Sequence, residues 1–469
     1  MDASALFAEY TAKTDYSNLP TSVISVTENI LTDSLACMLA GSNNPITQRT
    51  YALFKEIGGR EEATAFAGPS KLPAMHAALV NAVAGTCLDY NDLNEPSHTH
   101  IGISAVPAAL ALSEWLGEKV NGQDFLCALA VGMEIGCRLG RAAVKRVESQ
   151  VMGGWVYCSL HAGIISAIVA SKLMRLSAGQ TRNAIGIAYH QAAGNGQAAF
   201  DGTDVRVLGA GFAARNGILS ALLAAKGITG TQDSIDASEL SLMNLYHRGE
   251  HPNILLHNLG TKFEILETGF KLYPCCGLGH RQLDALSEMM KQHDLHPDEI
   301  QSIELRVPEL VYKQLCGEHT KKSPKNMSIA QFDLPWQLAC LAITGQLGLT
   351  QFTDALFQSD EINEFRKRII VQVDPSLTDE TVPAEIHVLT QRGTFFRRTE
   401  ARRGSPDKPF TYNDRRDKLL SCIGYGGQIS VETGERMIET ISSLKEMKSS
   451  PIDLLRLLPH KDNKLEEKV

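Results

Sequence analysis

Apolar and polar positions follow two different periods along the chain. In roughly the first 268 residues, apolar side chains recur every three to four positions in stretches rich in Ala and Val, which predicts helices. Small residues dominate these stretches, so we expect closely packed helices with one or two buried at the centre. The expected helices cover residues 20–40, 73–88, 104–116, 124–139, 158–174, 180–191 and 211–226.

From residue 299 the apolar side chains alternate with a period of two, which is typical of strands. Strands are expected at 300–307, 368–373, 385–389 and 394–400, and helices near 283–293 and at 328–344. Helical patterns return at 412–423, 432–447 and 452–458. The order predicts a mainly α protein with a large discontinuous helical domain (1–268 and 404–469) and an inserted smaller α+β domain (269–403).

Composition narrows the class of protein. The chain has 469 residues, of which 21% are charged and 43% apolar, so it is long enough for two or three globular domains. A net charge of −8 argues against nucleic acid as the main partner. We find no apolar run of membrane-spanning length and no targeting signal, and the first arginine is Arg49, so we expect a cytoplasmic protein without a membrane partner.

The ten cysteines lie mostly in apolar helical stretches, where free thiols behave as small hydrophobic side chains. No C-x-x-C pair occurs, which removes the usual zinc-ribbon and thioredoxin interpretations and the thiolate spacing of an aconitase-like iron–sulfur cluster. We therefore expect reduced cysteines and no disulfide framework.

The segment 269–280 concentrates reactive side chains at the joint between the helical and alternating parts. It carries Lys271, Tyr273, two adjacent cysteines and His280 among glycines and a proline. Clefts between domains shield ligands and can open and close, so this joint is a candidate active site. The alternative is a buried linker whose cysteine pair fills the core.

The loop 89–102 is the second candidate and is too polar to be the interior of a helix. Its acids are Asp89, Asp92 and Glu95, and its histidines are His98 and His100. These side chains suit a divalent metal, or acid–base chemistry in which a carboxylate orients a histidine. A merely solvated loop is the third interpretation, and the pattern leaves all three open.

Two further segments invite a functional interpretation. The fragment 209–213 is similar to a dinucleotide-binding turn, but no strand precedes it, and its small residues are better explained by close helix packing. Tyr157 and His161 lie four residues apart at the start of an expected helix and share a face. A lone histidine there is more often a core residue than a catalyst.

The string 271–280 resembles the signature of the 2-methylcitrate dehydratase family (MmgE/PrpD). Segment 89–92 followed by His100, segment 211–217 and segment 404–409 resemble other motifs of that family, so the similarity covers nearly the whole chain. The family includes 2-methylcitrate dehydratases, cis-aconitate decarboxylases and iminodisuccinate epimerases. The resemblance implies a large helical domain with an inserted α+β lid, a homodimer, no metal or organic cofactor, and an active site between the domains.

Residue by residue, the resemblance matches His100 to the family's loop histidine, Asp89 to its loop acid and Lys271 to its joint lysine. Arg206 stands where the family usually has lysine, and Val156 followed by Tyr157 stands where it has histidine. Arginine stays protonated and cannot act as a base, but its fork can hold a carboxylate. Arg206 is therefore expected to anchor substrate.

We expect a cofactor-independent hydro-lyase acting on a small 2-hydroxy di- or tricarboxylate such as 2-methylcitrate or another alkylcitrate. His100 would transfer protons, oriented by Asp89, while Lys271 binds a carboxylate and shares the proton transfer. Tyr157 or Tyr273 would protonate the leaving hydroxyl, with His161 and His280 as further pocket residues. The alternatives are a cis-aconitate-type decarboxylase, an epimerase, and a non-catalytic carboxylate-binding paralogue. Exact substrate, stereochemistry and pathway are left open.

Overall fold

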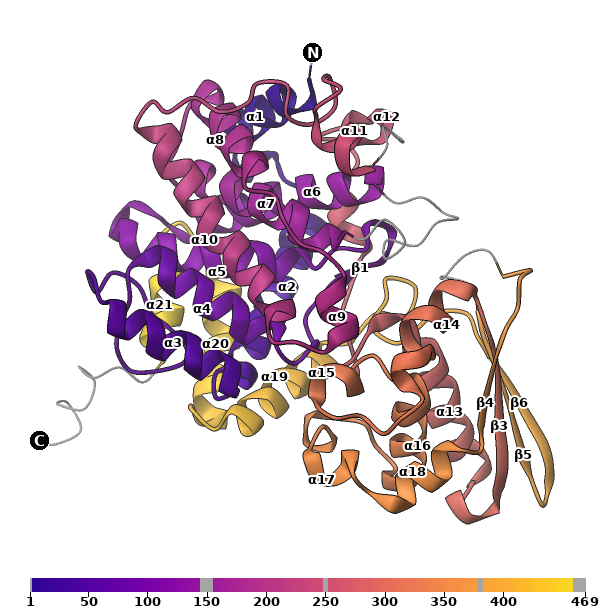
Figure 1. Cartoon of the computed structure of the whole chain (residues 1–469). Coiled ribbons are helices and arrows are strands. Elements are labelled where there is room, and N and C mark those ends of the chain that lie inside the picture. Colours follow the sequence, from indigo (N-terminus) through magenta and orange to yellow (C-terminus); the bar gives the residue numbers. More distant parts are fainter. Residues whose placement is uncertain (1, 144–154, 248–251, 378–382, 459–469) are drawn as a thin grey trace, which may run out of the picture.

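The computed structural model of the chain describes residues 2–143, 155–247, 252–377 and 383–458. Helices dominate it, so the chain is mainly α, as the apolar periods predict (Figure 1). The first part contains α1 (Ala3–Lys13), α2 (Thr21–Gly41), α3 (Pro45–Ile57), α4 (Ala74–Thr86), α5 (Ile101–Leu116), α6 (Gly122–Ala143), α7 (Tyr157–Leu173), α8 (Ala178–His190), α9 (Gln197–Asp201), α10 (Val205–Ala225), α11 (Leu242–His247) and α12 (Pro252–Leu256).

Helix α10 lies between α4 and α7 and shows why small residues fill these helices. A Cβ atom on Gly211 would lie 2.9 Å from the carbonyl oxygen of Leu79, and one on Gly217 would lie 2.3 Å from the Cβ atom of Ser166. The fragment 209–213 is thus helix interior in close contact with its neighbours. The helix begins at Val205, six residues before the expected start.

The α+β region follows and has its own hydrophobic core. Its sheet has the order β4-β3-β5-β6, with β3 parallel to β4 and antiparallel to β5. Helices α13 and α16 cover one face, toward which Ile303, Leu305 and Val307 of β3 are buried. The elements are α13 (His280–His293), β3 (Ile300–Val307), α14 (Glu309–Leu315), α15 (Met327–Ala330), α16 (Leu334–Thr344), α17 (Asp354–Phe357), α18 (Asp360–Arg366), β4 (Ile369–Val373), β5 (Ala384–Thr390) and β6 (Gly393–Thr399).

The expectation of a single helix at 328–344 is wrong, because the helical conformation is interrupted between α15 and α16. The carboxylate of Asp333 accepts a hydrogen bond from the backbone N–H of Trp336 at 2.9 Å and caps α16. Pro335 occupies the first turn of α16, where its missing N–H has no cost. The break leaves Gln331 and Phe332 outside regular helix, next to the cavity described below.

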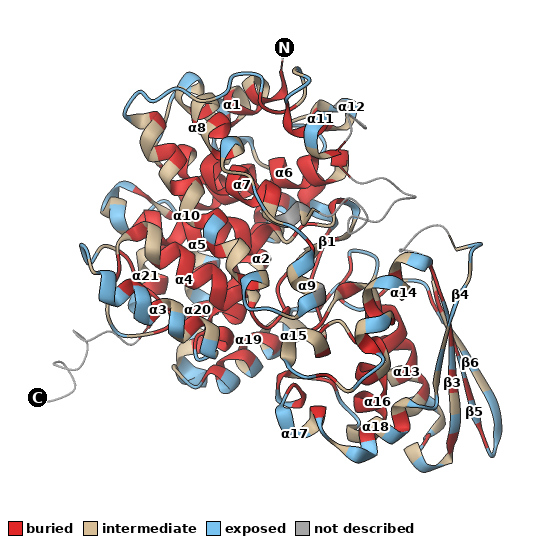
Figure 2. Cartoon of the chain, in the orientation of Figure 1, coloured by how far each residue is buried: buried red, intermediate tan, exposed pale blue. Residues whose placement is uncertain are grey.

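The chain then returns to the helical region through α19 (Tyr412–Gly426), α20 (Val431–Ser443) and α21 (Ile452–Arg456). Helix α19 packs against α2, and side chains from both ends of the chain share the first hydrophobic core. Figure 2 shows buried residues filling this helical region and the helix-covered side of the sheet. The two cores are separate, while the lid role of the α+β region stays a prediction.

Two helices, α2 and α10, are long and apolar enough to cross a membrane by length and composition. The expectation that no stretch reaches this length is therefore wrong. Most of α2 is buried inside the first core, and α10 packs against α4, α7 and α8. The fold accounts for their apolar character, because central helices of a large core have the same composition.

Candidate active site

A short antiparallel strand pair joins the loop 89–102 to the segment before Lys271. Strand β1 (Leu93–Asn94) pairs with β2 (Thr268–Gly269). The side-chain amide of Asn94 donates to Thr268 Oγ1 at 3.1 Å and to the carbonyl oxygen of Glu264 at 3.0 Å. Gly269 must lack a side chain, because a Cβ atom there would lie 2.5 Å from the carbonyl oxygen of Gly404. The two candidate segments therefore meet.

The loop itself is mostly buried, so the interpretation as a solvated loop is wrong. Asp89 and His98 have φ angles of +48° and +51°, in the left-handed region that costs energy for residues other than glycine. The buried carboxylate of Asp92 accepts the backbone N–H of Gly102 at 3.1 Å, in the first turn of α5. Surrounding contacts thus hold a strained loop in place beside the joint.

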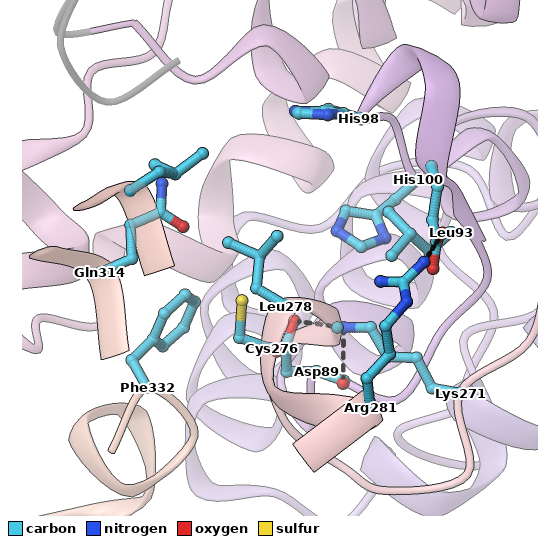
Figure 3. Close-up of a pocket in the computed structure, with 13 residues that line it drawn as sticks. Asp89, Leu93, His98, His100, Lys271, Cys276, Leu278, Arg281, Gln314 and Phe332 are labelled. Carbon is cyan, nitrogen blue, oxygen red and sulfur yellow. Dashed lines mark hydrogen bonds and ion pairs between the residues drawn. The ribbon is translucent and has the colours of Figure 1, made fainter. Parts of the chain in front are cut away.

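Lys271 and Asp89 form a buried ion pair at the wall of a cavity (Figure 3). The Nζ atom of Lys271 lies 3.1 Å from Asp89 Oδ1 and donates to the backbone carbonyl of Asp89 at 2.9 Å. The predicted loop acid and joint lysine are therefore brought together. The two contacts fix the position of the ammonium group at the cavity wall.

His100 is oriented by a backbone carbonyl. Its Nδ1 atom lies 2.5 Å from the carbonyl oxygen of Asp92. Because a carbonyl can only accept, Nδ1 carries the proton and Nε2 keeps its lone pair. Burial, followed by the charge of Lys271, lowers the pKa of His100 to about 4, so the ring is neutral near pH 7. Asp89 was expected to orient this ring, but the backbone carbonyl of Asp92 does so, while Asp89 Oδ1 pairs with Lys271.

The cavity has two adjoining compartments of about 140 and 220 Å³. Both are lined by Asp89 and His100 from the loop, and by Gln314 and Phe332 from the α+β region. Lys271 lines the first compartment and Arg206 the second. The predicted acid–base residue thus stands where the compartments join, with one predicted cation in each.

Arg206 belongs to the first turn of α10 and is held by the α+β region. Its Nε atom donates to Ser328 Oγ at 3.0 Å and an Nη2 hydrogen donates to Gln331 Oε1 at 2.6 Å. Its guanidinium lies 5.3 Å from the ring centre of Phe332. Within the described residues no carboxylate pairs with Arg206, so its charge is available to an anionic ligand.

Three predicted pocket residues lie outside the two compartments. The hydroxyl of Tyr273 donates to Asp284 at 3.0 Å within the second core, and burial followed by Asp284 raises its pKa, so it is a poor acid. His280 Nε2 lies 3.3 Å from the carbonyl oxygen of Cys275, and His161 Nε2 lies 3.0 Å from His247 Nε2. Direct substrate contact by these residues is not supported.

Tyr157 begins α7, and its side chain lies outside the described residues.

The cavity also contains residues that were not among the predicted site residues. Of the adjacent cysteines, Cys276 lines the first compartment, and burial raises its pKa to about 11, so it remains a thiol. Arg281 directly follows the signature that ends at His280 and lines the same compartment. Gln314 and Phe332 had no local signal, because only the folding of the α+β region brings them to the loop.

The metal interpretation of the loop is not supported by the described part of the chain, in which no three His, Cys, Asp or Glu side chains are grouped to hold an ion. Asp89 Oδ1 is paired with Lys271, and His100 Nδ1 is held by a backbone carbonyl. The arrangement instead provides a neutral histidine, an ammonium group and a guanidinium around one cavity. Such a set can bind carboxylates and transfer a proton.

Sequence models of two domain families match this chain. One, described as the MmgE/PrpD N-terminal domain, covers residues 5–254, and the other, the MmgE/PrpD C-terminal domain, covers residues 273–444. The chain is 27% identical over 364 residues to the cis-aconitate decarboxylase-like protein oryM of Aspergillus oryzae, covering 74% of each protein. It is 26% identical to a cis-aconitate decarboxylase of Aspergillus terreus (72% of this chain, 71% of the relative). It is 25% identical to the mouse cis-aconitate decarboxylase (94% and 90%).

Proposed function

This chain belongs to the MmgE/PrpD family, and we propose that it is a cofactor-independent lyase acting on a small di- or tricarboxylate. The observation that carries the proposal is that His100 and the ammonium group of Lys271 line the same cavity. His100 is neutral there, and its Nε2 atom is unprotonated. Arg206 supplies a second cation across the same cavity. This combination suits a polyanionic substrate from which a carbanion must form.

The proposed chemistry is proton transfer at a carbon next to a carboxylate. Loss of CO₂ or of a proton leaves an electron pair on that carbon, and Lys271 stabilises the resulting enolate-like charge. His100 Nε2 accepts a proton in dehydration or epimerisation and delivers one in decarboxylation. A bound polyanion favours the imidazolium form of His100, so for decarboxylation the required proton is taken up with the substrate.

Decarboxylation of a cis-aconitate-like acid is the favoured branch. The relatives named above carry that activity in their names, at 25–27% identity. Dehydration of 2-methylcitrate or another alkylcitrate is the second candidate. It also needs an acid for the leaving hydroxyl, and Tyr273, expected in that role, is bound to Asp284 outside the cavity. Tyr273 is therefore not placed to protonate a leaving hydroxyl in this cavity.

The branches are separated by incubating the chain with cis-aconitate, citrate and 2-methylcitrate in D₂O. We expect CO₂ release that matches cis-aconitate loss, with one solvent deuteron in each product molecule, measured by NMR and trapped CO₂. Water loss from 2-methylcitrate would assign the dehydratase instead, and deuterium uptake without net conversion the epimerase. Thermal stabilisation by these acids without turnover would identify a carboxylate-binding protein.

The assignment of His100 is tested with His100→Ala and a matched control. Loss of general acid–base catalysis should reduce turnover by about 10²- to 10⁴-fold, while the melting temperature stays close to that of the wild type. His296→Ala removes an exposed histidine of the α+β region and should leave turnover unchanged. Near-normal turnover of the His100 variant would remove this residue from the mechanism.

A further inference from the structure

Arg281, on α13, lines the first compartment (Figure 3). Two contacts fix its position. Its Nε atom donates to the carbonyl oxygen of Glu400 at 3.3 Å, and an Nη2 hydrogen donates to Glu95 Oε2 at 2.9 Å. A guanidinium has five N–H donors. The Nη1 amino group of Arg281 makes no hydrogen bond to the described residues. A pre-positioned donor therefore remains for a ligand.

The charges around Arg281 leave this end of the cavity positive. Glu95 is shared with Arg402, which is fully buried and also donates from Nη1 to the carbonyl oxygen of Phe270 at 2.7 Å. Burial alone would raise the pKa of Glu95, but Arg402 and Arg281 together hold it below its usual value. One ionised carboxylate thus faces two guanidiniums, and a positive charge remains uncompensated.

Arg206 has the same arrangement in the second compartment. Its Nε and Nη2 atoms are engaged by Ser328 and Gln331, while Nη1 has no hydrogen bond to the described residues. Of the two compartments, Arg206 lines only the second and Arg281 only the first, whereas His100 lines both. A fixed guanidinium therefore stands in each compartment, with the histidine between them.

We infer that Arg281 is a second carboxylate-binding residue of the cavity, opposite Arg206, so that substrate is held by a carboxylate at each end with its reacting carbon at His100. The inference rests on the proposed function and narrows its substrate class. The substrate must carry carboxylates on two separated carbons, and a central third carboxylate would lie near Lys271. Acids that lack one terminal carboxylate lose one of the two anchors.

The test uses binding and does not depend on turnover. Tricarballylate has two terminal carboxylates and a central one, while methylsuccinate lacks one terminal carboxylate. In Arg281→Gln, the dissociation constant for tricarballylate should rise about 10- to 100-fold, as expected for a lost charge-assisted hydrogen bond. The constant for methylsuccinate should change less than about threefold, because this acid can use Arg206 and the central position. Titration calorimetry measures both.

Arg392→Gln is the matched control, because it removes an exposed arginine paired with Glu299 in the same region and should bind both acids normally. If Arg281→Gln does not fold, Arg281→Lys keeps the charge but loses the planar fork, and tricarballylate binding should weaken about 3- to 10-fold. Unchanged tricarballylate binding, or equal weakening for both acids, would overturn the inference. A wild-type chain that binds neither acid would instead contradict the proposed function itself.

Discussion

Two buried lysine–aspartate pairs hold neighbouring carbonyl groups of the same loop. Lys271 pairs with Asp89 at 3.1 Å and donates to the carbonyl oxygen of Asp89 at 2.9 Å. Lys418 pairs with Asp33 at 2.6 Å and donates to the carbonyl oxygen of Tyr90 at 2.7 Å. All four side chains are at most 9% exposed. In residue types and burial the two pairs are alike.

The two lysine–aspartate pairs differ in their surroundings. Lys271 and Asp89 line the cavity, while Lys418 of α19 and Asp33 of α2 line none of the described compartments, and Lys418 Nζ lies 3.9 Å from the ring centre of Tyr90. Burial alone would lower the pKa of Lys418, but Asp33 holds it above its usual value. A buried ion pair thus does not identify a functional site by itself. Access to a ligand distinguishes the two.

Replacing each lysine by methionine should have the largest effect and should separate the two pairs. Lys271→Met should lower kcat/KM about 10²- to 10³-fold, because it removes the group that stabilises the developing anion. Lys418→Met should leave kcat/KM of the folded enzyme within about threefold. It should cost about 3–5 kcal/mol of stability, since Asp33 loses its counter-ion. Steady-state kinetics and thermal unfolding measure the two effects.

The double variant Lys418→Met/Asp33→Leu is the control for that stability loss. Replacing both charges by apolar side chains should restore much of it, because no uncompensated charge stays buried. The comparison would be contradicted if Lys418→Met lowered kcat/KM as much as Lys271→Met, or if Lys271→Met changed only stability.

A smaller effect concerns the titration of His100, which the Lys271 charge helps to suppress. The pKa of His100 is about 4 in the folded chain and near 6.5 in an unfolded one. The histidine therefore contributes stability above pH 6.5 that is lost as the pH falls toward 4. In Lys271→Met the pKa should rise but stay below 6.5, because burial is the larger cause. An NMR titration of labelled histidine measures the pKa of His100. An unchanged value in the variant would contradict the effect of the Lys271 charge on this pKa.

Three residues predicted from the sequence line the same cavity. Asp89, His100 and Lys271 stand in two polar, glycine-punctuated motifs, and their chemistry alone suggested a site in each. That the motifs meet follows from the pairing of β1 with β2, strands of two residues each, which are too short for any periodic signal. The helical periods likewise predicted α2, α4 and α5 to within a few residues.

Other parts could not be predicted, for identifiable physical reasons. Asp33 and Lys418 are 385 positions apart, and each looks like an ordinary helix residue until α19 packs on α2. Asp92, predicted as a candidate ligand or acid, contacts His100 through its backbone carbonyl, a group that every residue carries. By contrast, the break at Asp333 had a signal, since aspartate followed two residues later by proline is typical of a helix start.

The central claim is that the loop and the joint form one carboxylate-binding reactive site. A crystal structure of the complex with tricarballylate tests it most directly. We expect the terminal carboxylates within hydrogen-bonding distance of Arg206 and Arg281, and the central carboxylate beside Lys271 and His100 Nε2. Tricarballylate bound elsewhere, with the cavity around His100 occupied only by solvent, would contradict it.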